Sequence, residues 1–365
     1  MQRFAYISTI IQPTSGVLNK LERQAKTARE GAIPIDFYWT GKAAEVKTEA
    51  YPSLRLEPLD QSANSFQIRK QQAERVNSLL SEYDNVILRY TQWDPVTHLY
   101  LKDKKRIILE LHTRYLNELR SEGSWRYPFE WAFSSWLRPF GALTGVSPEI
   151  VASEVRRSGY QGKTTVIPNS INVDSFEVSD EPLWRDGETL KLIMVASQFY
   201  AWQGLELILA DIASSERSDF ELHLVGQLTP EQAQLAEKQA QVIVHGLKPV
   251  AELKDMYKEM HAGLSFFNLA HKNMTSTSAL KVCEYLAAGL PVISAHHDSA
   301  LPEDFAFELV TPNFDVARIH EFMKSIAQAS RQTIQSAARP YIDSLVNTKL
   351  LYDFCASLKT KADSS

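Results

Sequence analysis

Short apolar runs alternate with amphipathic stretches along most of the 365-residue chain. The apolar runs are rich in β-branched residues and are bounded by loops, which predicts buried strands at 4–10, 35–39, 85–88, 106–111, 165–167, 190–195, 221–225, 242–244, 263–266, 291–294 and 307–310. Helical periodicity predicts helices at 16–30, 65–82, 148–158, 205–212, 229–240, 250–260, 279–288 and 340–358. Alternating strands and helices of this kind indicate parallel sheets that helices cover on both faces.

The strands and helices fall into two sets that separate within residues 169–183. A chain of 365 residues is too long for one ordinary hydrophobic core. We therefore predict an α/β protein with two doubly wound, Rossmann-like domains that face each other across a cleft. The expected boundaries are 1–170, 171–345 and a C-terminal helix, 346–365, that packs back toward the first domain. Ligands are expected at the carboxyl ends of the strands.

Composition narrows the classes of protein without naming a function. The chain is 44% hydrophobic and 23% charged, and it has no apolar run long enough to span a bilayer. Its start, MQRFAYISTII, predicts a first strand and not a secretory signal. Two cysteines, Cys283 and Cys355, provide neither a disulfide framework nor a metal-ligand spacing, so we expect a cytoplasmic protein with no bound metal.

Charge is unevenly distributed along the chain. Residues 1–170 hold 23 Lys and Arg against 18 Asp and Glu, a net charge of +5, and the remaining 16 and 26 give −10. A basic first half is compatible with an anionic membrane surface or a phosphate-bearing acceptor, although a mildly basic domain is more often only a solvated surface. No feature of the sequence predicts binding to nucleic acid.

The stretch 275–293, TSTSALKVCEYLAAGLPVI, carries the strongest local signal. Small hydroxyl residues precede a helix, so Ser276, Thr277 and Ser278 are placed to bind an anion at the helix N-terminus. Glu284 follows Ser276 by eight residues, two helical turns along, where it can accept hydrogen bonds from sugar hydroxyls. The pattern predicts a nucleotide-sugar site, although an amphipathic helix with an ordinary N-cap explains these residues as well.

Several segments, in their order along the chain, resemble the family-4-like group 1 glycosyltransferases, which have the two-domain GT-B fold. The resemblance rests on VIPNS at 166–170 with Asp174 and Phe176, on the strand, loop and helix of 192–208, on His245-Gly246-Leu247 and on AAGLPVI at 287–293. It covers most of the chain and is weak before about residue 105. One such segment means little, but several in family order make coincidence an unsatisfactory explanation.

The resemblance implies a donor site for a nucleotide-diphosphate sugar, UDP- or GDP-linked, with no other cofactor. In it, Glu284 binds the ribose, the amides around Thr277–Ala279 bind the diphosphate, and the base lies against 245–247. Gly16, in the loop after the first strand, matches a glycine that lets the backbone approach the phosphates, although a plain strand-to-helix turn also explains it. The donor-binding residues that follow are Gly16, Asn169, Gln198, Gln203, Gly204, His245, Gly246, Leu247, Ser276, Thr277, Ser278, Ala279, Lys281 and Glu284.

His112 is the catalytic candidate. It follows an apolar run in LELHT, and it matches the family's histidine near the reacting sugar. Its expected role is to hydrogen-bond the transferred sugar or to place the acceptor hydroxyl, while the alternative is a structural histidine.

The chain departs from the family pattern where the chemistry occurs. The family usually has two glutamates eight residues apart, and the first position here is Ser276. Gln198 and Gln203 stand where arginine and lysine often neutralise the diphosphate. Because glutamine supplies no charge, Lys281 is the expected compensating cation, unless it is merely a solvated lysine.

The run WRYPFEWAFSSW at 125–136 is unusually aromatic, and Lys102, Lys104, Lys105 and Arg106 precede it. An interfacial helix would use such residues to touch lipid headgroups, while burial in the first domain is the expectation we favour. Peripheral contact with the inner face of a membrane is the alternative.

The resemblance implies a metal-independent hexosyltransferase that uses a nucleotide-diphosphate sugar with retention, and bacterial surface polysaccharide or glycoconjugate synthesis is the expected context. The acceptor is a saccharide, a lipid-linked molecule or a protein. Two alternatives remain: a non-catalytic GT-B subunit that supports a partner glycosyltransferase, and a nucleotide-sugar epimerase on the same fold.

Overall fold

The computed structural model describes residues 2–13, 15–42, 48–121 and 123–358. The chain divides into two compact units. Unit 1 comprises Met1–Pro168 together with Ser344–Ser365, and unit 2 comprises Asn169–Asp343. Each unit is built around one parallel sheet.

Unit 1 has a seven-stranded parallel sheet with the order β3-β2-β1-β4-β5-β6-β7. The strands are β1 (Phe4–Ser8), β2 (Ile35–Lys42), β3 (Arg55–Leu59), β4 (Asn85–Arg89), β5 (Ile107–Leu111), β6 (Ala142–Gly145) and β7 (Lys163–Val166). The α-helices are α1 (Ser15–Glu30), α2 (Ser65–Glu82), α3 (Pro95–Tyr100), α4 (Tyr115–Ser121), α5 (Tyr127–Ala132), α6 (Pro148–Ser158) and α13 (Ser344–Ala356). Strands β1, β4 and β5 are buried at almost every position, as expected for the centre of a sheet that helices cover on both faces.

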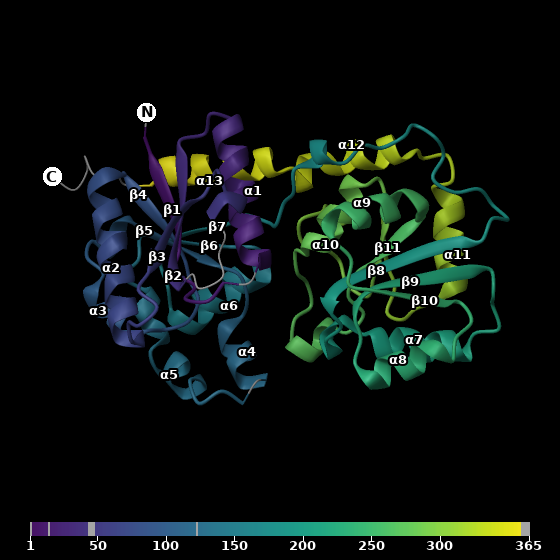
Figure 1. Cartoon of the computed structure of the whole chain (residues 1–365), viewed down its shortest axis with the longest axis horizontal. Helices are drawn as coiled ribbons and strands as arrows, with labels where there is room; N and C mark the ends of the chain where they lie inside the picture. Colours follow the sequence, from purple (N-terminus) through teal and green to yellow (C-terminus); the bar gives the residue numbers. More distant parts are fainter. Residues whose placement is uncertain (1, 14, 43–47, 122, 359–365) are drawn as a thin grey trace. The chain divides into compact units, whose positions relative to one another are not determined.

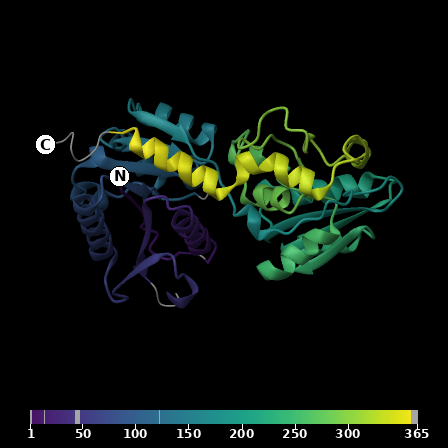
Figure 2. The ribbon, with the colours of Figure 1, turned by 90° about the horizontal axis from the view of Figure 1, so that it is seen from above.

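The direction of the crossovers decides which face each helix covers. The β1–α1–β2 connection leads outward along the sheet, and β3–α2–β4 returns in the opposite direction. Right-handed crossovers therefore place α1 and α2 on opposite faces, which Figure 1 shows. Helix α13 lies beside α1, although more than 300 residues separate them along the chain (Figure 2).

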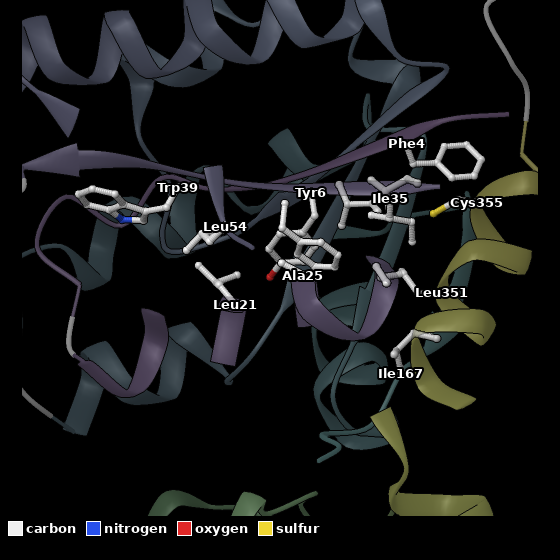
Figure 3. Packing of buried hydrophobic residues seen from close by; sticks show 14 of the residues in the cluster. Phe4, Tyr6, Leu21, Ala25, Ile35, Trp39, Leu54, Ile167, Leu351 and Cys355 are labelled. Carbon is white, nitrogen blue, oxygen red and sulfur yellow. The ribbon is translucent and has the colours of Figure 1, made fainter. Parts of the chain in front are cut away.

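The core of unit 1 is made from both ends of its sequence. Phe4 and Tyr6 on β1 pack with Leu21 on α1, and Leu351 and Cys355 on α13 complete the same cluster (Figure 3). These five side chains are at most 2% exposed, so α13 is part of the core and not an appended tail.

Unit 2 has a six-stranded parallel sheet with the order β10-β9-β8-β11-β12-β13. The strands are β8 (Leu190–Gln198), β9 (Phe220–Gln227), β10 (Val242–Gly246), β11 (Ala262–Leu264), β12 (Val292–Ser294) and β13 (Glu308–Val310). The α-helices are α7 (Leu205–Ser214), α8 (Pro230–Glu237), α9 (Val250–Glu259), α10 (Leu280–Ala287), α11 (Val316–Ser325) and α12 (Arg331–Ile342). Helices α7 and α8 lie on one face of the sheet, and α9 and α10 lie on the other (Figure 1).

A buried arginine fixes the end of α10. The Arg331 guanidinium donates hydrogen bonds to the carbonyls of Tyr257, Lys258, Met260 and Ala288. Gly289 follows α10 with φ +71°, and a Cβ there would lie 2.5 Å from Cβ of Arg331. Glycine is therefore required at this turn both for its backbone conformation and for the close approach of Arg331.

The predicted α/β class and the two parallel sheets are confirmed. Helices α2 and α6 begin and end where the sequence predicts, because the N-caps Asn64 and Ser147 and the left-handed Gly159 define their ends. The predicted single helix at 340–358 is wrong, since α12 continues through Pro340 and α13 begins anew at Ser344. The sequence pattern did not predict two strands. They are β3, an edge strand that contains Pro58, and the short strand β6.

Candidate functional site

The strand order of unit 2 reverses between β8 and β11, and doubly wound folds bind ligands at such a switch point, beyond the carboxyl ends of the strands. Gln198 ends β8, and Ser265 and Phe266 directly follow β11. Several buried polar atoms near this position have no hydrogen-bond partner among the described residues. They are Oε1 of Gln203, Oγ of Ser265 and Nζ of Lys281.

Lys281 is the most unusual of these groups. Its Nζ is buried and lies 4.7 Å from the centre of the Phe266 ring, a cation–π contact. Burial lowers the pKa of Lys281 to about 7, and the nearby Glu284 carboxylate only partly opposes that shift. An ammonium group without a hydrogen-bond partner is costly to bury, so its retention here indicates an anionic ligand.

The N-terminus of α10 is arranged differently from the sequence expectation. The backbone N–H of Ala279 donates to the buried Asp298 carboxylate over 2.9 Å, so that amide is already satisfied by a side chain. The first helical residues, Leu280 and Lys281, have N–H groups that no intrahelical carbonyl can reach. The donors offered to an anion therefore lie slightly further along the chain than the predicted Thr277–Ala279.

Ser278 and Asn169 bind each other. The Ser278 hydroxyl accepts the backbone N–H of Asn169 over 3.0 Å, and the Ser278 carbonyl accepts its side-chain amide over 2.7 Å. The backbone of Thr277 pairs with that of Asp298 in an isolated parallel β-bridge. These predicted donor-binding residues therefore brace the loop that leads into α10.

Glu284 and Ser276, the pair eight residues apart, lie on different elements. Glu284 is half-buried on α10, and Tyr257 donates its hydroxyl to Glu284 Oε2 over 3.4 Å. Ser276 is half-buried in the loop before the helix. No acidic side chain occupies the position of the absent first glutamate in the sequence.

The loop between β8 and α7 presents one glutamine and buries the other. Gln198 is exposed, while Gln203 is 5% exposed. Gly204 has φ +79°, and a Cβ there would come within 2.8 Å of the Phe267 backbone. This position accepts only glycine without a shift of the loop that follows β11.

His245, the penultimate residue of β10, lies in contact with another histidine. Its Nε2 lies 3.0 Å from Nδ1 of His223, whose Nε2 lies 3.2 Å from the Glu221 carboxylate. Burial and the neighbouring His223 lower the pKa of His245. Gly246 has φ +67° with open space around it, and Leu247 is exposed, so the backbone of this turn is accessible.

A second polar cluster lies at the switch point of unit 1, between β1 and β4. His112 follows β5, and its Nε2 lies 2.6 Å from Oε2 of the buried Glu110, which also accepts the Tyr6 hydroxyl. Nδ1 of His112 lies 3.5 Å from Nζ of Lys20. Both ring nitrogens of the predicted catalytic histidine are thus engaged within unit 1.

The charge states of this cluster follow from its surroundings. Burial, with Lys20 and Arg89 nearby, lowers the pKa of His112 to about 3, so the imidazole is neutral near pH 7. Burial alone would raise the pKa of Glu110, but His112, Lys20 and Arg89 together lower it. The ionised Glu110 therefore accepts a hydrogen bond from the protonated Nε2 of His112. Nδ1 of His112 remains available as an acceptor.

Other residues of unit 1 for which the sequence made a prediction are Gly16, the aromatic run at 125–136 and Arg106. Gly16 is exposed in the first turn of α1. The predicted burial of the aromatic run is wrong for Trp125, Phe129 and Trp131, which are 75%, 43% and 63% exposed. Arg106, expected in a basic surface group, is buried and donates to the carbonyls of residues 80, 83 and 84.

Two kinds of feature are absent from the described ranges. No group of three or more histidine, cysteine, aspartate or glutamate side chains there is arranged to hold a metal ion. None of the helices described is both long enough and apolar enough to cross a bilayer.

Comparison with known proteins finds a family match within unit 2. Residues 190–329 match the family model for glycosyl transferases group 1, and that range includes β8 to β13 and the polar atoms at the switch point. This part of unit 2, called the group 1 domain below, is therefore similar to the group 1 glycosyltransferases. A comparison with curated proteins finds no match.

Solved glycosyltransferases share the fold of the whole chain. The apo lipopolysaccharide outer core galactosyltransferase WaaB is 13% identical with a TM-score of 0.66, over 97% of this chain and 99% of its own. Anabaena Alr3699/HepE, crystallised with UDP and glucose, is 14% identical with a TM-score of 0.67, over 98% and 100%. Sucrose-phosphate synthase from Thermosynechococcus elongatus is 16% identical with a TM-score of 0.66, over 98% and 100%. The chain therefore has the GT-B fold of these structures.

The sequence pattern did not predict a role in the site for several residues of the group 1 domain. Asp298, Ser265 and Phe266 follow strands at the switch-point end of the sheet, and Asp298 supplies the carboxylate that the Ala279 amide binds. Their positions after strands were the available signal, but no local motif marks them.

Proposed function

We propose that the chain transfers a hexosyl group from a nucleotide-diphosphate sugar, UDP- or GDP-linked, to an acceptor hydroxyl, with the donor bound by the group 1 domain. The observation that carries the proposal is the buried Lys281 ammonium, which has no hydrogen-bond partner among the described residues. A diphosphate supplies the oxygen acceptors and the negative charge that this group lacks. The Leu280 and Lys281 amides at the start of α10 add backbone donors of the same polarity.

The remaining contacts of the donor follow from this placement. Glu284 lies one turn beyond Lys281 on α10, where its carboxylate accepts hydrogen bonds from the ribose hydroxyls. The accessible backbone at 245–247 binds the edge of the base. Lys281 and the helix N-terminus stabilise the leaving diphosphate, so the proposed reaction needs no metal ion.

Retention of configuration is the proposed outcome of the transfer. The acceptor oxygen attacks on the face from which the diphosphate departs, and an oxygen of the leaving group takes the acceptor proton. This same-face route needs no separate carboxylate base. The glycosyltransferase crystallised with UDP and glucose supports a UDP-linked donor.

Glu284→Gln is expected to weaken the binding of the preferred nucleoside diphosphate by about 1–3 kcal/mol, because a neutral amide replaces an ionised hydrogen-bond acceptor. Calorimetry on the purified full-length variant measures the change. Glu252→Gln is the matched control, because Glu252 is exposed on α9 and pairs only with Lys248 among the described residues. Equal affinities of the wild type and a folded Glu284→Gln variant would show that the ribose is placed wrongly.

A panel of nucleoside diphosphates followed by product analysis tests the function as a whole. Binding of UDP or GDP, with release of the nucleotide in the presence of an acceptor, supports the transferase. The substitutions at Ser276, Gln198 and Gln203 favour, as a second candidate, a non-catalytic subunit, which would bind nucleotide without turnover even with acceptors supplied. An epimerase would change the sugar without any acceptor, and failure to bind every nucleotide would contradict the donor site.

The proposal extends to a lipid-linked or surface-polysaccharide acceptor at the inner face of a membrane. The exposed aromatic residues of α5 and its preceding turn, Trp125, Phe129 and Trp131, are of the type that enters lipid headgroups, and the cation of Arg126 lies 5.8 Å from the Trp125 ring. A basic surface near such rings attracts anionic lipid.

A double variant, Trp125→Ala with Trp131→Ala, is expected to lower partitioning onto vesicles of phosphatidylglycerol and phosphatidylcholine by about fivefold or more, because two indole rings no longer enter the interface. Co-sedimentation measures the partition coefficient. The control is Phe66→Ala, which removes an aromatic side chain that is 53% exposed elsewhere on unit 1. The membrane proposal fails if the double variant and the control partition alike.

A further inference from the structure

Unit 1 contains a cavity that the proposed donor site does not use. Thr9, just after β1, and Arg89, at the end of β4, line it, so the cavity opens at the switch point of this sheet. Its free volume is about 50 Å³ for the centres of water-sized atoms. One water needs about 10–15 Å³ on this measure, so the space suits a group of a few heavy atoms and not a whole saccharide.

Aromatic rings form one wall of the cavity. Trp93 stacks on Phe133 with ring centres 4.3 Å apart and meets Trp136 at 5.2 Å. Trp136 in turn stacks on His98 at 4.1 Å, and all four side chains line the cavity. An apolar wall of this kind strengthens any charged hydrogen bond made beside it, because it excludes water.

Two residues that line the cavity each carry a buried hydrogen-bond donor with no partner among the described residues. The donors are Nη1 of Arg89 and Nε1 of Trp93. Each of these nitrogens can only donate, so both require an acceptor and neither can satisfy the other. Buried donors that lack acceptors are rare in folded proteins, and two on the same cavity indicate a missing ligand group that carries oxygen acceptors.

The charges around the cavity favour an anion. Nε of Arg69 lies 3.0 Å from the Asp94 carboxylate, so these two charges neutralise each other. Burial and the charge of Lys104 lower the pKa of His98 to about 4, which leaves its ring neutral near pH 7. Lys20 and Arg89 act on the same carboxylate, that of Glu110, so one positive charge in this network is not neutralised. The Glu130 carboxylate, which contacts the lining residues Tyr90 and Trp93, is paired with Arg157.

We infer that this cavity binds a small oxyanion, the carboxylate or phosphate group of an acidic acceptor, through Arg89 and Trp93. An oxyanion offers several acceptor lone pairs within the space available, and a guanidinium is well suited to bind it. Its role as part of the acceptor rests on the proposed glycosyltransferase function, whereas the binding of an oxyanion does not. Since Arg89 also influences the charge of Glu110 and His112, the anion would anchor the acceptor close to that network.

The test compares charged and neutral sugars on the full-length protein, with saturating UDP present so that phosphate does not enter the proposed donor site. Methyl glucuronide supplies a carboxylate, glucose 6-phosphate supplies a phosphate, and methyl glucoside is the neutral probe. Tryptophan fluorescence follows binding, because Trp93 and Trp136 line the cavity. At least one anionic sugar is expected to bind about tenfold or more tightly than methyl glucoside.

Three variants locate the binding. Arg89→Gln is expected to abolish the preference for the anion, and Trp93→Phe, which keeps the aromatic wall, is expected to reduce it severalfold. Arg126→Gln is the matched control, because Arg126 is exposed and donates only to Gln92 among the described side chains. If Arg89→Gln does not fold, the Trp93→Phe variant alone decides the outcome.

The result that would overturn the inference is equal binding of charged and neutral sugars, or an anion preference that both cavity variants retain. The two anionic probes distinguish a carboxylate from a phosphate. UDP binding is recorded in the same samples, so the proposed donor site is tested separately. A protein that binds no UDP is titrated with the same sugars alone, and an anion preference lost in Arg89→Gln still supports the cavity.

Discussion

Replacing Lys281 with methionine is expected to stabilise unit 2 by ~3 kcal/mol at pH 6 while lowering affinity for UDP more than tenfold. Burying an ammonium group costs several kcal/mol when no partner compensates it, and an apolar side chain of similar length removes that cost. The same change removes the charge proposed to bind the diphosphate. A gain in stability with a loss of binding is characteristic of a residue retained for its ligand.

In the wild type, the free energy of unfolding and the affinity for UDP change in opposite directions as pH rises. Because the pKa of Lys281 is lowered to about 7 in the folded protein, the unfolded chain binds the additional proton between pH 7 and the ordinary value of 10.5. The contribution of Lys281 to the free energy of unfolding therefore rises over this interval. The stability gained by Lys281→Met shrinks as pH rises. UDP affinity of the wild type falls over the same interval, since the ammonium is lost.

Urea unfolding and UDP calorimetry at pH 6, 7 and 8.5 measure both quantities. The loss of affinity is expected to be larger for UDP than for uridine, which lacks the diphosphate. Lys324→Met is the matched control, because Lys324 is exposed on α11 and pairs with Asp186. Equal losses for UDP and uridine would remove Lys281 from the phosphate site, and a destabilised Lys281→Met would contradict the cost assigned to its burial.

Glu110→Gln is expected to destabilise unit 1 by ~3 kcal/mol near neutral pH, because it leaves the cations of Lys20 and Arg89 without the buried carboxylate. The lowered pKa of Glu110 means that its stabilising contribution is complete above about 4.5 and is lost as pH falls further. The wild type and the variant therefore converge in stability toward acid pH. Tryptophan fluorescence during urea unfolding reports mainly on unit 1, which contains five of the seven tryptophans, including Trp39 in its core.

A double-variant cycle separates charge from packing at this site. Adding Lys20→Met to Glu110→Gln is expected to recover part of the lost stability, because one unpaired cation disappears with it. Glu74→Gln, which changes an exposed ion pair with Lys70 on α2, is the control and is expected to alter stability by less than about 1 kcal/mol. Strict additivity of the Glu110 and Lys20 variants would show that their charges do not interact.

Periodicity predicted the architecture well, because burial on both faces gives central strands a continuous apolar signature. It failed where packing and not local pattern decides the structure. Strand β3 is an edge strand with exposed Arg55 and Pro58, and its place in the sheet depends on its pairing with β2. Helix α12 tolerates Pro340 in its interior, which local rules alone count as a helix end.

The sequence likewise predicted only part of the candidate donor site. The approximate extent of α10 follows from local residues and was predicted. The Asp298 carboxylate that binds the Ala279 amide comes from a loop 19 residues further along the chain, and no local pattern reveals such a pairing. Whether a lysine is solvated or buried without a partner also depends on tertiary packing, so the state of Lys281 could only be raised as a question from the sequence.

The division of unit 1 into two segments sets an order for its assembly on the ribosome. Unit 2 is one uninterrupted segment, and it is fully synthesised before Ser344. Leu351 and Cys355, which close the core around Phe4 and Leu21, are made only after all of unit 2. Unit 1 therefore cannot complete its core until unit 2 has been synthesised, and part of one apolar face of its nascent sheet must wait for α13.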